Sequence, residues 1–185
     1  MSIIVMEGSN GAGKTTIIKN MQINYEFISK KSIPDWYRKY IPFARSLPPE
    51  LQKKVYMIGH EANYMSFNKN NDYILDRFYY STIIRLNYEL EKTIFDTVNE
   101  ILEIQMLPDI VIYLNTNKEL ILNRLVQRGN LVFDSSFFEY ENKVFMCLME
   151  KYDRMVSINN NEDIDISIKK ITKELELKRI ILRRR

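Results

Sequence analysis

A glycine-rich stretch near the start of the chain has the residue types that bind phosphate. The segment MEGSNGAGKTT places three glycines within six positions and follows them with a lysine and two threonines. Backbone N–H groups freed by such glycines bind phosphate oxygens, and the positive end of a following helix adds to the attraction. Lys14 is placed to reach the β- and γ-phosphates, and the Thr15 hydroxyl to hold Mg²⁺. The stretch therefore predicts a binding loop for a nucleoside triphosphate.

The same stretch fits the P-loop pattern G-x-x-x-x-G-K-[ST], which is meaningful only between a strand and a helix. Residues 2–7 are apolar and rich in β-branched side chains, as in a buried strand, and residues 14–21 indicate the first turns of a helix. The required context is therefore predicted. The residues expected to contact the nucleotide are Gly8, Asn10, Gly11, Ala12, Gly13, Lys14, Thr15 and Thr16.

A second group of chemically active residues lies in the segment ILDRFYYST, where a short apolar strand ends in Asp76 and Arg77. In a parallel sheet the carboxyl ends of the strands face the ligand crevice. Asp76 would then accept a hydrogen bond from a metal-bound water or an acceptor hydroxyl. Arg77 would hold a phosphoryl group through two parallel hydrogen bonds.

The hydrophobic pattern predicts the elements that must position these groups. Strands are expected at 2–7, 25–29, 72–76, 109–114 and 156–159, and helices at 14–21, 49–67, 80–106, 117–128, 137–155 and 165–178. Strands that alternate with helices indicate an α/β fold with a parallel sheet covered on both sides.

Composition narrows the class of protein. A chain of 185 residues with 45% hydrophobic and 28% charged residues predicts one globular domain, 1–185. The absence of a long apolar run predicts no membrane span, and the single Cys147 suits the reducing cytoplasm. A net charge of +3 is too small to indicate nucleic-acid binding. The basic residues at 178–185 either attract anions or flank the end of the last helix, and we favour the second interpretation.

Other P-loop classes fit less well. A GTPase requires a guanine-reading N-K-x-D element, but Leu120 occupies the aspartate position after Asn117 and Lys118. The acidic pair at a strand end that is typical of a translocating ATPase is missing from the sequence as well.

The segments MEGSNGAGKTT, DRFYYS, PDIVIYLN and LNRLVQRG, in this order, resemble the thymidylate kinase family of P-loop nucleotide kinases. The likeness extends through FFEYENKVFMCLMEKY and SIKKITKEL, and so covers nearly the whole chain. It implies the three-layer P-loop kinase fold, with five parallel strands between helices. It also implies transfer of the γ-phosphoryl group of ATP, with Mg²⁺, to a nucleoside monophosphate, usually dTMP, in nucleotide biosynthesis. Relatives are commonly dimers, so a homodimer is possible.

The resemblance also implies roles for individual residues. Thr16 would lie near the α-phosphate, and Thr15 and Asp76 beside the metal ion. Arg124 and Arg128, four residues apart on one helix face, fall in a segment that resembles the family's lid, around 124–138. They would neutralise charge on the transferred phosphoryl group. The expected catalytic residues are Lys14, Asp76, Arg77, Arg124 and Arg128.

Departures from the family pattern fall on the acceptor side. Thymidylate kinases carry a carboxylate where this chain has Asn10, so a contact to the sugar would differ. They also use an aromatic residue and an arginine four apart on one helix, where this chain has Tyr56 and His60. Tyr56 is able to stack on a base, whereas a neutral His60 is a poor substitute for a phosphate-binding arginine.

These departures leave the acceptor open. In the related deoxynucleoside kinases a carboxylate takes the proton of the 5′-hydroxyl, and Asp35 lies about where that base is needed. Trp36 would line the same pocket, whereas Arg38 suits an acceptor that already carries phosphate. We favour a monophosphate kinase over a nucleoside kinase, and both over an ATP-binding protein without kinase activity. The expected acceptor-binding residues are Asn10, Asp35, Trp36, Arg38, Tyr56, His60 and Arg77.

Overall fold

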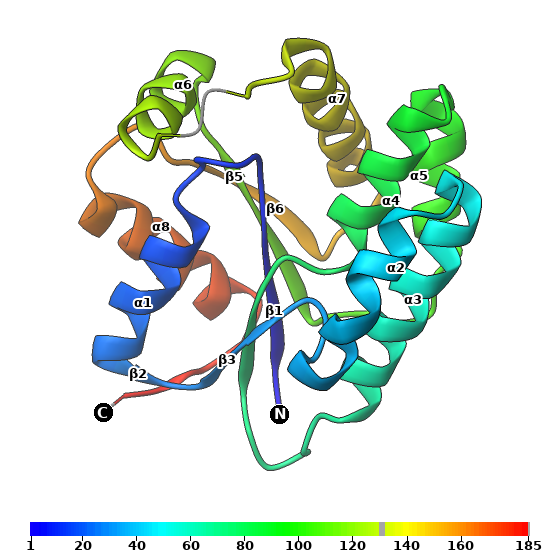
Figure 1. The fold of residues 1–185 in the computed structure, drawn as a ribbon. Coiled ribbons are helices and arrows are strands. Elements are labelled where there is room, and N and C mark those ends of the chain that lie inside the picture. The colour runs from blue at the N-terminus through cyan, green and yellow to red at the C-terminus, as the bar shows by residue number, and fades with distance from the viewer. Residues whose placement is uncertain (130–131, 185) are drawn as a thin grey trace.

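A parallel sheet forms the centre of the molecule. The computed structural model describes residues 1–129 and 132–184. In this part of the chain five parallel strands lie in the order β3-β4-β1-β5-β6 (Figure 1). The strands are β1 (Ile3–Glu7), β3 (Ile28–Lys31), β4 (Tyr73–Asp76), β5 (Ile110–Asn115) and β6 (Met155–Asn159). The five-stranded parallel sheet expected from the sequence is thus confirmed.

Helices cover both faces of this sheet, which explains why the central strands are apolar on both sides (Figure 1). Every residue of β1 is buried, and the side chains of Ile3 to Met6 alternate between two hydrophobic clusters. One cluster lies under α1 (Lys14–Asn24) and α8 (Ile164–Leu177). The other lies under α4 (Tyr79–Glu89), α5 (Ile94–Leu102) and α7 (Ser135–Lys151). The remaining helices are η1 (Asp35–Tyr40), a 3₁₀ helix, and α2 (Ile41–Arg45), α3 (Pro49–Met65) and α6 (Lys118–Gln127).

None of the described helices is long and apolar enough to cross a membrane.

The structure corrects two sequence predictions. The helix expected at 80–106 is divided into α4 and α5. The chain turns at Glu91, which has a φ of 54°, and Thr93 then caps α5 by accepting a hydrogen bond from the backbone N–H of Asp96 at 3.1 Å. The strand expected at 25–29 is likewise divided, because β2 (Tyr25–Glu26) leaves the main sheet and β3 begins only at Ile28.

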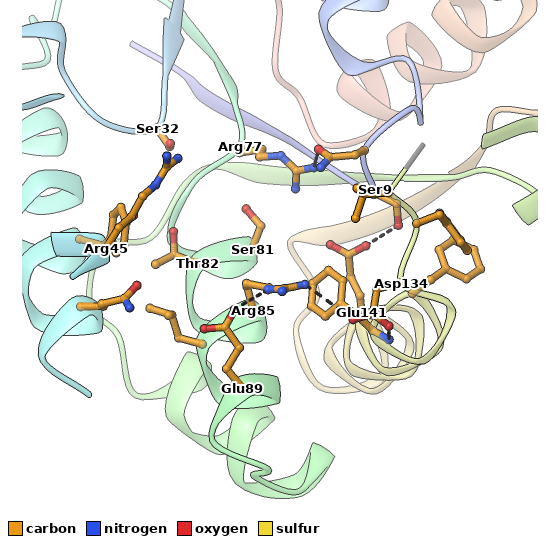
Figure 2. A pocket seen from close by; sticks show the side chains of 18 of the residues that line it. Ser9, Ser32, Arg45, Arg77, Ser81, Thr82, Arg85, Glu89, Asp134 and Glu141 are labelled. Carbon is orange, nitrogen blue, oxygen red and sulfur yellow. Dashed lines mark hydrogen bonds and ion pairs between the residues drawn. The ribbon is translucent and has the colours of Figure 1, made fainter. Parts of the chain in front are cut away.

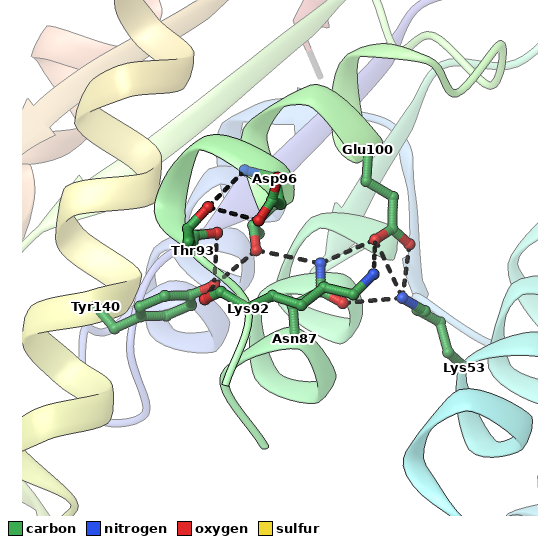
Figure 3. A network of polar contacts seen from close by, with 8 residues as sticks. Lys53, Asn87, Lys92, Thr93, Asp96, Glu100 and Tyr140 are labelled. Atoms are coloured by element: carbon green, nitrogen blue, oxygen red, sulfur yellow. Dashed lines mark hydrogen bonds and ion pairs between the residues drawn. The ribbon is translucent and has the colours of Figure 1, made fainter. Parts of the chain in front are cut away.

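A polar network holds α4 in place between its neighbours (Figure 3). The ammonium group of Lys53 on α3 donates to Asn87 Oδ1 at 2.8 Å and lies 2.8 Å from Glu100 on α5. Asn87 is fully buried on α4 and donates to both Glu100 and Thr97. The Tyr140 hydroxyl on α7 lies 2.6 Å from Thr97 Oγ1. These contacts fix α4 relative to α3, α5 and α7, and α4 forms one wall of the pocket described below.

The basic C-terminal segment is part of the fold. After α8, Ile180 and Leu182 enter the cluster beneath α1 and α8, each with only 8% of its surface exposed. The strand β7 (Arg183–Arg184) then pairs with β2 in an antiparallel ladder. The segment therefore continues past the end of the last helix, where it packs into the α1–α8 cluster and pairs with β2.

This packing predicts that Ile180→Ala lowers the free energy of unfolding by about 2 kcal/mol, because it removes buried methyl groups from that cluster. Ile181→Ala is the matched control, since Ile181 is 80% exposed and its truncation should change stability by less than about 0.5 kcal/mol. Urea denaturation of both variants measures the difference. Equal stabilities would contradict a structural role for the segment.

Candidate active site

The glycine loop joins β1 to α1 at the carboxyl edge of the sheet, and its backbone requires glycine at several positions. Gly8, Gly11 and Gly13 have φ values of 135°, 88° and 94°. A Cβ atom on Gly8 would lie 2.8 Å from the Leu114 carbonyl oxygen, so any side chain there would collide with β5. The N-terminus of α1 begins directly after the loop, at Lys14. The strand–loop–helix context that the P-loop pattern needs is thereby confirmed.

The Lys14 side chain folds back over this loop. Its ammonium group donates to the carbonyl oxygens of Gly8 at 2.6 Å and Ser9 at 3.0 Å, and the residue is only 7% exposed. Burial and the neighbouring Arg77 lower the pKa of Lys14 below its ordinary value. The Lys14 ammonium group is therefore buried and held by two backbone carbonyls of the glycine loop.

Asp76 is the last residue of β4 and Arg77 follows it, and both lie beside the glycine loop. The Thr15 hydroxyl donates to Asp76 Oδ2 at 2.6 Å. Arg77 has a φ of 72°, a left-handed conformation that non-glycine residues rarely adopt. Its guanidinium donates to Asn10 Oδ1 at 2.9 Å. The structure thus brings together four residues that the sequence predicts for one site.

Glu7 is a buried carboxylate beneath this group. Its Oε1 accepts from the backbone N–H of Phe78 at 2.8 Å, and its Oε2 lies 3.8 Å from the Arg77 guanidinium. Burial raises the pKa of Glu7 above its ordinary value, while Arg77 opposes that rise. Glu7 therefore holds both the backbone and the side chain of the strained segment. A glutamate at the end of an apolar strand, directly before the glycine loop, was a sequence signal for this role that our prediction did not use.

Of the two predicted lid arginines, Arg124 lies on α6 and Arg128 follows directly after its last residue, Gln127. Arg124 donates to the Gly11 carbonyl at 3.2 Å, which places its guanidinium on the glycine loop. Burial and the nearby Arg128 lower the pKa of Arg124. Arg128 is exposed at the end of α6. Residues 130–131 of the predicted lid, 124–138, lie outside the described residues.

A pocket of about 670 Å³ adjoins the glycine loop (Figure 2). Ser9, Asn10 and Arg77 lie at one end of it. Its walls come from the end of β3, from α2, α3 and α4, and from the start of α7. The lining residues on these walls include Ser32, Arg45, Gln52, Tyr56, Thr82, Arg85, Glu89, Asp134, Phe137 and Glu141. This volume suits a ligand of nucleotide size.

Only some of the residues predicted to bind the acceptor line the pocket. Asn10, Arg77 and Tyr56 line the pocket. Asp35, whose side chain is 93% exposed, pairs with the Arg38 guanidinium at 3.2 Å, and Trp36 is 62% exposed. These three residues of η1 lie outside the pocket lining.

His60 is fully buried behind the pocket wall. Its Nδ1 lies 3.1 Å from the Ser32 carbonyl, and its Nε2 lies 2.9 Å from the Thr82 hydroxyl. Because a carbonyl only accepts, Nδ1 carries the proton and Nε2 accepts from Thr82. Burial lowers the pKa of His60 to about 4, so the ring is neutral. It thus joins the segment directly after β3 to α4 through Ser32 and Thr82, which both line the pocket.

Several charged pocket residues were not anticipated from the sequence. Arg45 extends from α2 to the same wall as Ser32 (Figure 2). On α4 the Arg85 guanidinium donates to Glu89 at 2.7 Å and lies 4.7 Å above the Phe137 ring. The spacing of four between Arg85 and Glu89 predicts their pairing, but no local signal places either of them, or Arg45, at a pocket.

The chain belongs to the thymidylate kinase family, because that family's sequence profile matches residues 60–178, more than half of its length. Membership of this family and the fold support a P-loop kinase that phosphorylates a nucleoside or a nucleotide. A comparison with curated proteins finds no match.

Solved structures share the fold. Deoxyadenosine kinase from M. mycoides with bound dATP is 23% identical, with a TM-score of 0.65 over 95% of this chain and 100% of that chain. Thymidylate kinase from Candida albicans is 17% identical, with a TM-score of 0.69 over 99% of this chain and 97% of that chain. At these identities the likeness shows the fold.

The buried His60 predicts a pH-dependent stability. Its pKa is about 4 in the folded protein and 6.5 ordinarily, so below pH 6.5 the unfolded chain binds a proton that the folded protein does not. Its contribution is therefore complete above pH 6.5 and falls by roughly 3 kcal/mol as the pH drops to 4. In urea denaturation between pH 4 and 8, His60→Gln should lose stability less steeply than the wild type over this window. If the stabilities of the two proteins fell equally with pH, the assignment of a buried, neutral His60 would be contradicted.

Proposed function

We propose that the protein transfers the γ-phosphoryl group of ATP to a deoxynucleoside monophosphate, most simply dTMP or a close analogue. The observation that carries this proposal is the pair of arginines, Arg45 and Arg77, that line the pocket beside the glycine loop. Arginine suits a phosphate because its planar guanidinium donates two parallel hydrogen bonds. An acceptor nucleotide would place its phosphate beside these two arginines and direct its base toward Tyr56 and Phe137.

The donor side follows from the glycine loop. Its backbone N–H groups and Lys14 would bind the triphosphate of ATP, and Arg124 would approach it from α6. Arg77, whose guanidinium lies 3.8 Å from Glu7, would lie between donor and acceptor. Fixed positive groups of this kind lower the barrier by stabilising charge on the transferred phosphoryl group, and they need no rearrangement during the step.

The Thr15 hydroxyl and the Asp76 carboxylate suit Mg²⁺. Both are hard oxygen ligands in direct contact at the accessible side of the loop. Mg²⁺ is usually bound through one or two protein groups, with phosphate oxygens and water completing its octahedron. When bound, the ion neutralises phosphate charge and aligns the donor.

A nucleoside kinase that uses Asp35 as its base is the second candidate. Against it, Asp35 is exposed and paired with Arg38, and the pocket residue that follows β3 is Ser32. The third candidate, an ATP-binding protein without transfer activity, would be expected to have a filled or uncharged acceptor crevice. The open pocket with its arginines counts against that interpretation.

Substitution of Arg45, with Arg38 as the comparison, distinguishes a monophosphate kinase from a nucleoside kinase. Arg45→Ala should raise the KM for a monophosphate by about tenfold to a hundredfold, because a charge-assisted hydrogen bond to phosphate is lost. It should change the KM for the matching nucleoside by less than about threefold. Steady-state ADP release with ATP held constant measures both.

Arg38→Ala is the matched comparison, since that guanidinium faces Asp35 outside the pocket lining. If Arg38→Ala alone raises the KM for the monophosphate, the phosphate is bound by η1 and the assignment to Arg45 is wrong. If neither substitution affects it, the acceptor carries no phosphate at this end of the pocket.

A further inference from the structure

A second buried carboxylate, Glu141 on α7, lies on the pocket wall beside the glycine loop. Only 1% of its surface is exposed, and its Oε2 accepts a hydrogen bond from the Ser9 hydroxyl (Figure 2). Among the described residues the hydrogen bond of this carboxylate is the one from Ser9 to Oε2, and no donor is paired with its other oxygen, Oε1. The kinase chemistry outlined above does not use this group.

The position of Glu141 along the pocket indicates which part of a nucleotide it would meet. Phe137 lies about one helical turn earlier on α7, about 6 Å away along the helix axis, and packs under the Arg85 guanidinium. At the other end, Ser9 joins Glu141 to the glycine loop next to Asn10. In the view of Figure 2 the Glu141 carboxylate lies below Arg77 and above Arg85. If phosphate lies at Arg77 and the base near Phe137, the sugar lies opposite Glu141.

The neighbouring side chains leave Glu141 as a suitable acceptor for a sugar hydroxyl. Asn10 is the adjacent pocket residue, but its Oδ1 already accepts from Arg77 at 2.9 Å. The Ser9 hydroxyl is committed as a donor to Glu141 itself. A carboxylate in a desolvated wall strengthens a hydrogen bond from a ligand hydroxyl and disfavours a ligand that lacks one.

We propose that Glu141 is a substrate-binding residue that accepts a hydrogen bond from the 3′-hydroxyl of the acceptor deoxyribose. The inference rests on the proposed function, because a 2′-deoxynucleotide has the 3′-hydroxyl as its single ring hydroxyl. It assigns to α7 the carboxylate that recognises the sugar, and it makes a free 3′-hydroxyl a requirement of the substrate. Ser9 orients the carboxylate and is a positioning residue.

The test compares dTMP with its 2′,3′-dideoxy counterpart in the wild type and in Glu141→Gln. The wild type should prefer dTMP in kcat/KM by about tenfold to a hundredfold. Glu141→Gln should lower kcat/KM for dTMP to near the value for the dideoxy compound and leave the latter within about threefold of the wild type. Glu139→Gln, an exposed position two residues earlier on α7, should leave both values unchanged.

A purely structural link between α7 and the glycine loop would give a different result, because Glu141→Gln would then reduce both substrates equally and keep their ratio. That outcome, or a wild type indifferent to the 3′-hydroxyl, overturns the proposal. If Glu141→Gln does not fold, Ser9→Ala keeps the carboxylate but frees it, and the preference for the 3′-hydroxyl should still fall several-fold. An unchanged preference in a folded Ser9→Ala variant counts against the proposal.

A failure of the proposed function can be distinguished from a failure of the role proposed for Glu141. If thymidine turns over and dTMP does not, the monophosphate assignment fails, and thymidine with its 3′-deoxy counterpart then tests Glu141 in the same variants. If neither turns over, titration calorimetry with the same two pairs is the readout. Equal affinities of the 3′-hydroxyl and 3′-deoxy ligands in the wild type overturn the role of Glu141.

Discussion

The tight contact between the glycine loop and the carboxyl edge of the sheet is the constraint on which the site depends. A side chain on Gly8 would meet the Leu114 carbonyl at 2.8 Å, and one on Gly11 would meet the Ile121 carbonyl at 3.2 Å. The buried Asn160 amide after β6 also donates to the Ala12 carbonyl. The loop is therefore fixed against β5, β6 and α6, and Lys14, Asp76 and Arg77 are positioned relative to it.

This constraint explains how charged groups remain buried at the edge of a hydrophobic core. Glu7 and Lys14 are almost inaccessible, and each would be costly alone. Lys14 and Arg77 both lie near the Glu7 carboxylate, so attraction between opposite charges offsets part of the cost of burying Glu7 and Lys14. The like charge of Arg77 adds to the cost for Lys14. The same arrangement leaves the Arg77 guanidinium at the pocket lining, where a phosphate would add a second anionic partner beside Glu7.

The glycine loop and the five-stranded parallel sheet could be predicted from the sequence, whereas the walls of the pocket could not. The glycine loop and the Asp76–Arg77 pair are contiguous segments next to strands, so a local pattern places them. Arg45, Arg85 and Glu141 reach one pocket from three different helices, and only tertiary packing brings them together. The role of Asp35 stays a prediction that its exposed position does not favour. The division of 80–106 was different, since Thr93 and Asp96 carry a capping signal that the helical periodicity obscured.

The most direct test of this account is an ADP-release screen of the common nucleosides and their monophosphates with ATP and Mg²⁺. We expect turnover of one or more deoxynucleoside monophosphates, with dTMP or a close analogue preferred, and little turnover of the matching nucleosides. Turnover of nucleosides alone would contradict the assignment of Arg45 and Arg77 to an acceptor phosphate. The absence of turnover with every acceptor would contradict the kinase assignment.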